Sequence, residues 1–160
     1  MYKKQLNAGN RQWAGAMRTD LLDARDWVIA HGYADPKRIA IFGGSYGGYA
    51  VLAALTFTPE AFTCGIDIVG PSNLNTFLAA IPPYWKQIRS TLTMRMGEDP
   101  AFLDTQSPIH RAYDIRAPLL IAHGAKDPRV AQQESDQIVE TLRANGIPVT
   151  YIVFENEGHD

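Results

Sequence analysis

The fold of this chain is constrained most strongly by a set of four short apolar segments. Helical patterns precede and separate them. In chain order, these segments are residues 38–43, 64–70, 118–124 and 149–155. The helical patterns span residues 14–31, 46–59 and 131–146. Continuously apolar strands that alternate with helices are typical of a parallel sheet whose two faces are both covered. The pattern therefore predicts an α/β fold, with a parallel sheet of about four strands and helices on both faces.

The segment 71–113 does not follow this alternation. It mixes short helical patterns with prolines at positions 82, 83, 100 and 108, and proline interrupts a helix. We expect an irregular helical excursion between the second and third strands rather than one long helix.

Size and composition place the chain among ordinary globular proteins. Its 160 residues suffice for one domain, 46% of them are hydrophobic, and the formal net charge is −2. This balance gives no reason to expect nucleic acid or an anionic membrane as a partner. The single cysteine, Cys64, and the spacing of the histidines argue against a zinc site, so no metal is expected. No apolar run is long enough for a membrane span, and a cytoplasmic location follows by default.

A glycine-rich turn joins the first strand to the helix that follows it. Residues 43–47 read Gly-Gly-Ser-Tyr-Gly and match the pattern G-x-S-x-G. In that motif the serine stands on a sharp, strained turn, so that its hydroxyl is lifted out of the sheet. We expect side chains at Gly43 and Gly47 to collide with adjacent chain, and the Tyr46 N–H to face the same space as Ser45. A phosphate loop is excluded because no G-K-[ST] follows.

A serine nucleophile needs a base, and the base needs a carboxylate that orients it. In this architecture the order along the chain is Ser, then Asp or Glu, then His. Asp127 follows the strand 118–124, and His159 follows the strand 149–155. The carboxyl ends of parallel strands meet at one edge of a sheet, where active sites lie. The order and placement predict that Ser45, Asp127 and His159 converge there.

Other titratable residues compete for these roles. The competing histidines are His31 at a helix end, His110 in the irregular segment, and His123 within a strand. The competing acids are Asp67 within a strand and Glu155 and Glu157 near His159. His123 is expected to serve packing or loop hydrogen bonding. Asp67, which precedes its strand end, and the two glutamates stay open as alternatives to Asp127 for the orienting carboxylate.

Four sequence segments resemble a known family. They read NAGNRQW, DPKRIAIFGGSYGGY, HGAKDPRV and FENEGH. They are similar to the C-terminal part of the α/β-hydrolase catalytic domain of prolyl oligopeptidase family serine peptidases, in the acylaminoacyl-peptidase and dipeptidyl-peptidase branch. The resemblance implies Ser45 as nucleophile, Asp127 as orienting acid, His159 as general base and the Tyr46 N–H as an oxyanion donor. Gly43 and Gly47 would shape the nucleophile turn.

The implied activity is hydrolysis of peptide bonds in short peptides through an acyl-enzyme, without a cofactor. A related esterase or lipase, or a catalytically weak non-enzymatic fragment, stays open as an alternative. The family's β-propeller and earlier hydrolase strands find no match in residues 1–160, so we expect a partial hydrolase domain. Its serine strand would be an open sheet edge and His159 would sit on an unanchored terminus. Homo-oligomerisation is left open.

Overall fold

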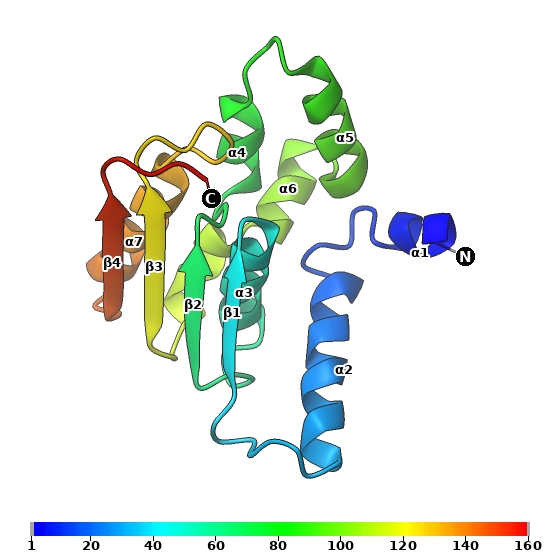
Figure 1. The fold of residues 1–160 in the computed structure, drawn as a ribbon, viewed down its shortest axis with the longest axis vertical. Coiled ribbons are helices and arrows are strands. Elements are labelled where there is room, and N and C mark those ends of the chain that lie inside the picture. Colours follow the sequence, from blue (N-terminus) through cyan, green and yellow to red (C-terminus); the bar gives the residue numbers. More distant parts are fainter. Residues whose placement is uncertain (1, 160) are drawn as a thin grey trace.

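The computed structural model describes residues 2–159 of the chain. Within them, four strands form one sheet in the order β1-β2-β3-β4, and each neighbouring pair is parallel. The strands are β1 (Ala40–Gly44), β2 (Cys64–Ile68), β3 (Leu119–Gly124) and β4 (Val149–Phe154). All four strands point upward in Figure 1, so their carboxyl ends lie along one edge of the sheet. The predicted parallel four-stranded sheet is confirmed.

The helices follow the predicted rhythm, with an irregular stretch between β2 and β3. Their bounds are α1 (Tyr2–Ala8), α2 (Ala16–Ala30), α3 (Tyr46–Phe57), α4 (Leu74–Ala80), α5 (Lys86–Met96), α6 (Pro100–Gln106), the 3-10 segment η1 (Pro108–Asp114) and α7 (Gln133–Ala144). The expected excursion over 71–113 is confirmed as α4, α5, α6 and η1. Sequence reasoning did not anticipate α1.

Helix α3 lies against the sheet and forms its main core. Every residue from Gly48 to Thr56 is buried, and Leu55 packs in one cluster with Ile121 and Ile138. Gly65 lets the helix approach β2, because a Cβ there would lie 2.6 Å from the Leu55 Cδ1 atom. The same kind of close approach occurs at the start of α3, beside the turn that carries Ser45, because a Cβ at Gly48 would lie 2.8 Å from the Gly70 Cα atom.

The expectation of helices on both faces of the sheet is wrong for the residues described. Helices α3 and α7 lie behind the sheet in Figure 1, whereas α2 lies beside β1 and buries none of its residues. On the opposite face, Phe42 is 71% exposed and Phe154 is 50% exposed. A continuously apolar strand indicates that both of its faces can be buried, but it does not indicate which segment packs against each face.

A second core cluster joins α3 to the excursion. Tyr49 is fully buried, and its hydroxyl donates to the Gln106 carbonyl at 2.7 Å. Trp13, just before α2, packs edge-on against Tyr46 with ring centroids 4.9 Å apart. The two large side chains in the first turn of α3, Tyr46 and Tyr49, are therefore held by contacts with segments that precede and follow the helix in sequence.

Candidate active site

Ser45 occupies the turn between β1 and α3 with a backbone that non-glycine residues rarely adopt. Its φ is 58° and its ψ is −120°. Such a conformation costs of the order of 1–3 kcal/mol and persists only when its surroundings hold it. The Ser45 N–H helps to hold this conformation, because it donates to the Ile68 carbonyl at the end of β2 at 2.8 Å. The strained turn predicted from the sequence is present.

The glycines of this turn differ in what they permit. A Cβ at Gly43 would run into the Gly47 backbone, including its Cα at 2.8 Å, so the predicted collision occurs there. A Cβ at Gly47 would meet no atom within 4 Å, so the collision expected at this position is wrong. The physical reason is directional: the Gly47 backbone faces Gly43 while its own missing side chain points into open space. Gly48 is the second crowded glycine, since a Cβ there would lie 2.9 Å from the Gly70 nitrogen.

The structure brings Ser45, His159 and Asp127 together at the carboxyl edge of the sheet. His159 Nε2 lies 2.9 Å from Ser45 Oγ, and His159 Nδ1 lies 2.7 Å from Asp127 Oδ2. A carboxylate can only accept, so Nδ1 carries the ring proton, and Nε2 is free to accept from the Ser45 hydroxyl. The three side chains form one continuous hydrogen-bonded series across 114 residues of sequence separation.

Asp127 is held by its own loop. Its Oδ1 atom accepts from the backbone N–H groups of Arg129 at 2.7 Å and Val130 at 2.9 Å. The Asp127 side chain is fully buried, and that of His159 is 9% exposed. With Oδ1 engaged by two donors, Oδ2 is the oxygen that faces the imidazole, which fixes the orientation of the carboxylate.

The loop that carries His159 is anchored, contrary to the expectation of an unanchored terminus. The Ala125 N–H donates to the Phe154 carbonyl and the Lys126 N–H donates to the Glu157 carbonyl, each at 3.0 Å. The chain crosses so closely over Gly124 that a Cβ there would lie 2.6 Å from the Glu157 carbonyl oxygen. These backbone hydrogen bonds join the loop after β4, which carries His159, to the loop after β3, which carries Asp127. The two residues are therefore held by the same pair of connected loops.

The Tyr46 N–H is the remaining predicted group. Tyr46 is the first residue of α3, and the first N–H groups of a helix have no acceptor within the helix. Its side chain turns away to Trp13, and burial raises the pKa of its phenol to about 12. The phenol therefore stays protonated at neutral pH, and its hydroxyl donates to Met17 Sδ at 3.7 Å, so the Tyr46 group that the sequence predicts as an oxyanion donor is its backbone N–H.

The competing residues lie elsewhere or have other partners. His31 stacks on Trp27 at the end of α2, and exposed His110 contacts Asp104. His123 is buried with hydrogen bonds to Ser135 and Val130, as expected for loop hydrogen bonding. Asp127, rather than Glu155 or Glu157, bonds the His159 ring.

Asp67 lies on β2 opposite Gly43, next to the serine turn, and is fully buried. Its Oδ1 accepts from the Gly70 N–H at 2.9 Å, while no partner is found for its Oδ2 among the described residues. Burial raises the pKa of this carboxyl to about 7. Asp67 therefore packs against Gly48 and Gly70, and the hydrogen bond found for its side chain goes to Gly70 rather than to His159.

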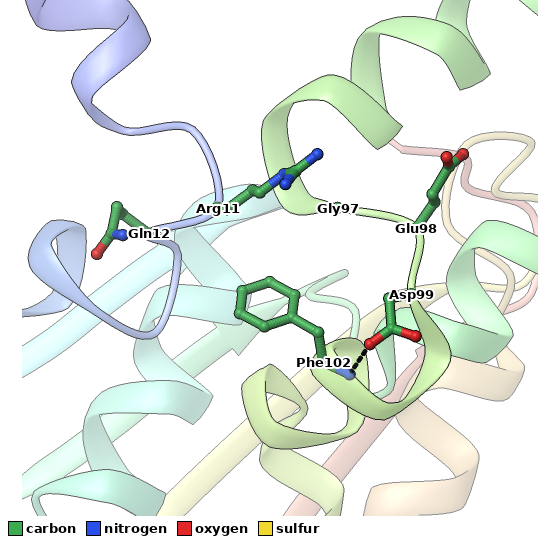
Figure 2. A pocket seen from close by; sticks show the side chains of 6 residues that line it. All are labelled: Arg11, Gln12, Gly97, Glu98, Asp99 and Phe102. Atoms are coloured by element: carbon green, nitrogen blue, oxygen red, sulfur yellow. Dashed lines mark hydrogen bonds between the residues drawn. The ribbon is translucent and has the colours of Figure 1, made fainter.

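Two cavities flank this end of the molecule. One, of about 390 Å³, lies beside His159 and is lined by Val69, Phe154 and Glu157 among others. A larger one, of about 540 Å³, lies between the segment of Arg11 and Gln12 and the start of α6 (Figure 2). There the Asp99 carboxylate caps α6 by accepting from the Phe102 N–H at 2.9 Å. Only the smaller cavity adjoins the Ser45–His159–Asp127 series.

Between residues 2 and 159, no three His, Cys, Asp or Glu side chains are grouped so that they could hold a metal ion. None of the helices within the same range has the length and apolar content needed to cross a bilayer.

The chain is similar to several known peptidases. The chain is 54% identical over 158 residues to dipeptidyl aminopeptidase BIII of Pseudoxanthomonas mexicana, covering 96% of this chain and 23% of the relative. It is 47% identical over 163 residues to dipeptidyl peptidase family member 6 of Caenorhabditis elegans, covering 98% and 22%. A puromycin-hydrolyzing peptidase of Mycobacterium tuberculosis superposes with a TM-score of 0.87 at 32% identity, covering 96% and 23%.

The chain thus spans less than a quarter of the length of these relatives. The model of the prolyl oligopeptidase family matches residues 3–160, and the chain belongs to that family.

Proposed function

We propose that this chain carries the catalytic residues of a serine peptidase that hydrolyses peptide bonds of short peptides. The observation that supports this most is the hydrogen-bonded series from Ser45 Oγ through His159 to Asp127 Oδ2. The peptidase names of the relatives add a reaction class to that geometry. Because the chain spans under a quarter of their length, the activity of the whole protein is part of the proposal.

The first half of the reaction forms an acyl-enzyme. Ser45 Oγ attacks the carbonyl carbon of the substrate while its proton passes to His159 Nε2. Asp127 accepts from Nδ1–H, so it keeps the imidazole in the reactive tautomer and stabilises its charged form. When the tetrahedral intermediate collapses, the C–N bond breaks and the leaving amine takes the proton from Nε2. The acyl group is then held as an ester on Ser45.

The second half repeats these transfers with water. His159 Nε2 takes a proton from a water molecule as that water attacks the ester carbonyl, and Ser45 Oγ recovers the proton when it leaves. In both halves the negative charge on the carbonyl oxygen is stabilised by the Tyr46 N–H at the start of α3. Gly43 allows the turn to aim the hydroxyl and this N–H at the same space.

A fluorophosphonate probe tests whether Ser45 is a nucleophile in this chain. We expect a single adduct on the wild-type protein and none on the Ser45→Ala variant. Ser107→Ala, which removes a different buried serine hydroxyl, serves as the matched control and should label normally. A folded wild-type chain that takes up no probe would contradict the proposal.

The substrate class is tested separately. A short peptide amide and a nitrophenyl ester, assayed side by side, distinguish a peptidase from an esterase that uses the same three residues. We expect hydrolysis of both, with the peptide amide turned over in a Ser45-dependent way. Ester hydrolysis without amide hydrolysis would favour the esterase. A β-propeller partner domain, homo-oligomerisation and a cytoplasmic location stay predictions.

A further inference from the structure

Two buried polar side chains lie immediately behind the orienting carboxylate. His123, at the end of β3, is 1% exposed, and Ser135, in the first turn of α7, is fully buried. His123 Nδ1 lies 2.7 Å from Ser135 Oγ, and His123 Nε2 lies 3.0 Å from the Val130 carbonyl oxygen. Their contacts therefore join α7, β3 and the loop that carries Asp127.

The hydrogen-bond directions follow from the acceptors. The Val130 carbonyl can only accept, so His123 Nε2 carries the proton and Nδ1 accepts from the Ser135 hydroxyl. Burial lowers the pKa of the His123 ring, which favours this neutral form. A neutral ring, although 3.7 Å from Asp127 Oδ2, does not compete as a cation for the oxygen that His159 uses.

Val130 links this ring to the carboxylate. Its carbonyl accepts from His123, and its N–H donates to Asp127 Oδ1 at 2.9 Å. Oδ1 is one of the two carboxylate oxygens, and the other bonds His159. A shift of the Val130 peptide would therefore rotate the carboxylate away from the His159 ring, although neither Ser135 nor Val130 touches the nucleophile.

We propose that His123 and Ser135 form a positioning pair that holds the Asp127 loop in register with His159. This proposal deepens the proposed function and rests on it for the catalytic role of Asp127. The pair acts through hydrogen bonds alone: Ser135 fixes the His123 ring, His123 fixes Val130, and Val130 fixes the oxygen of Asp127 that does not face His159.

The variants separate positioning from plain stability. His123→Phe keeps an aromatic ring and removes both nitrogens, whereas His123→Gln restores a terminal N–H that can reach the Val130 carbonyl. Ser135→Ala removes the hydroxyl that donates to His123 Nδ1. Ser107→Ala is the matched control, since its buried hydroxyl bonds the Leu74 N–H and the Leu103 carbonyl, away from Asp127.

The first readout is the proton NMR resonance of His159 Nδ1–H, which its bond to a carboxylate moves far downfield of the amide region. The second is the rate of fluorophosphonate labelling at Ser45. We expect His123→Phe and Ser135→Ala to broaden or lose the resonance and to slow labelling about fivefold, the equivalent of one net hydrogen bond. His123→Gln should recover most of both signals, and Ser107→Ala should leave both unchanged.

The outcomes distinguish this proposal from the proposed function. If His123→Phe or Ser135→Ala folds and keeps both the resonance and the labelling rate, the positioning role is wrong. If His123→Phe does not fold, Ser135→Ala and His123→Gln still decide the matter. If the wild type shows the resonance but takes up no probe, the proposed function fails, and the resonance of the variants alone tests the pair. A wild type that takes up the probe but lacks the resonance would overturn the pair while leaving the proposed function standing.

Discussion

Replacement of Asp67 by asparagine should change how the stability of this protein depends on pH. Asp67 is fully buried next to the serine turn, and burial raises the pKa of its carboxyl to about 7 from an ordinary 3.8, against the smaller opposing effect of the Gly70 N–H bond. Asparagine has nearly the same shape and keeps an oxygen that can accept from Gly70, but it does not titrate. The comparison therefore isolates the ionisation of one side chain.

The sign of the effect follows from proton uptake. Between pH 3.8 and about 7 the folded chain holds a proton on Asp67 that the unfolded chain releases. The stabilisation is therefore complete below pH 3.8 and is lost as the pH rises through about 7. This displacement of the pKa corresponds to about 4 kcal/mol of unfolding free energy, of which about 3 kcal/mol is lost between about pH 5 and pH 8.

Urea unfolding of the wild type and Asp67→Asn at several pH values measures this quantity directly. The wild-type unfolding free energy minus that of the variant should fall by about 3 kcal/mol from about pH 5 to pH 8. Equal urea m-values in the two proteins would show that their unfolding exposes the same surface. A difference that stays constant across this range would refute the buried, proton-holding carboxyl.

Three further predictions concern backbone positions around the site. Gly43→Ala should lower the unfolding free energy by about 1–3 kcal/mol, because its Cβ meets the Gly47 backbone. Gly47→Ala, whose Cβ meets nothing within 4 Å, should cause no loss, and equal losses of the two variants in thermal unfolding would contradict this asymmetry. Ser45→Gly should be about 1 kcal/mol more stable than Ser45→Ala in urea unfolding, because glycine relieves the strain of a φ of 58°. Neither variant should take up the probe, and an alanine variant as stable as the glycine variant would mean that the turn is unstrained. Gly124→Ala should displace the loop that crosses Gly124 and slow fluorophosphonate labelling by about tenfold or more, because a misplaced catalytic group loses its alignment. An unchanged labelling rate would show that the position of the His159 loop does not depend on this crossing.

Much of the site could be predicted because its determinants are local in sequence. The G-x-S-x-G turn stands between a strand and a helix, and Asp127 and His159 each follow a strand directly. Parallel strands bring their carboxyl ends to one edge, so three separate local patterns suffice to place three side chains together. The same reasoning explains why the strands of the sheet were found close to their observed bounds.

The remaining features depend on which surfaces meet in three dimensions. The motif wrongly predicts a collision at Gly47, because crowding at a glycine depends on the direction of its missing Cβ, which the motif does not state. The contact of His123 with Ser135 joins a strand end to the next helix, and no spacing rule signals it. The uncovered face of the sheet could not be anticipated either, since strands with Phe42 and Phe154 look equally apolar with or without a covering segment.

Mass spectrometry of the probe-treated chain tests the catalytic assignment most directly. Digestion after fluorophosphonate treatment should yield one modified peptide, with the adduct on Ser45, and the yield should collapse in His159→Ala, where Ser45 loses the acceptor 2.9 Å from its hydroxyl. An adduct on another residue, or equal modification of Ser45 in folded His159→Ala, would contradict activation of this serine by that imidazole.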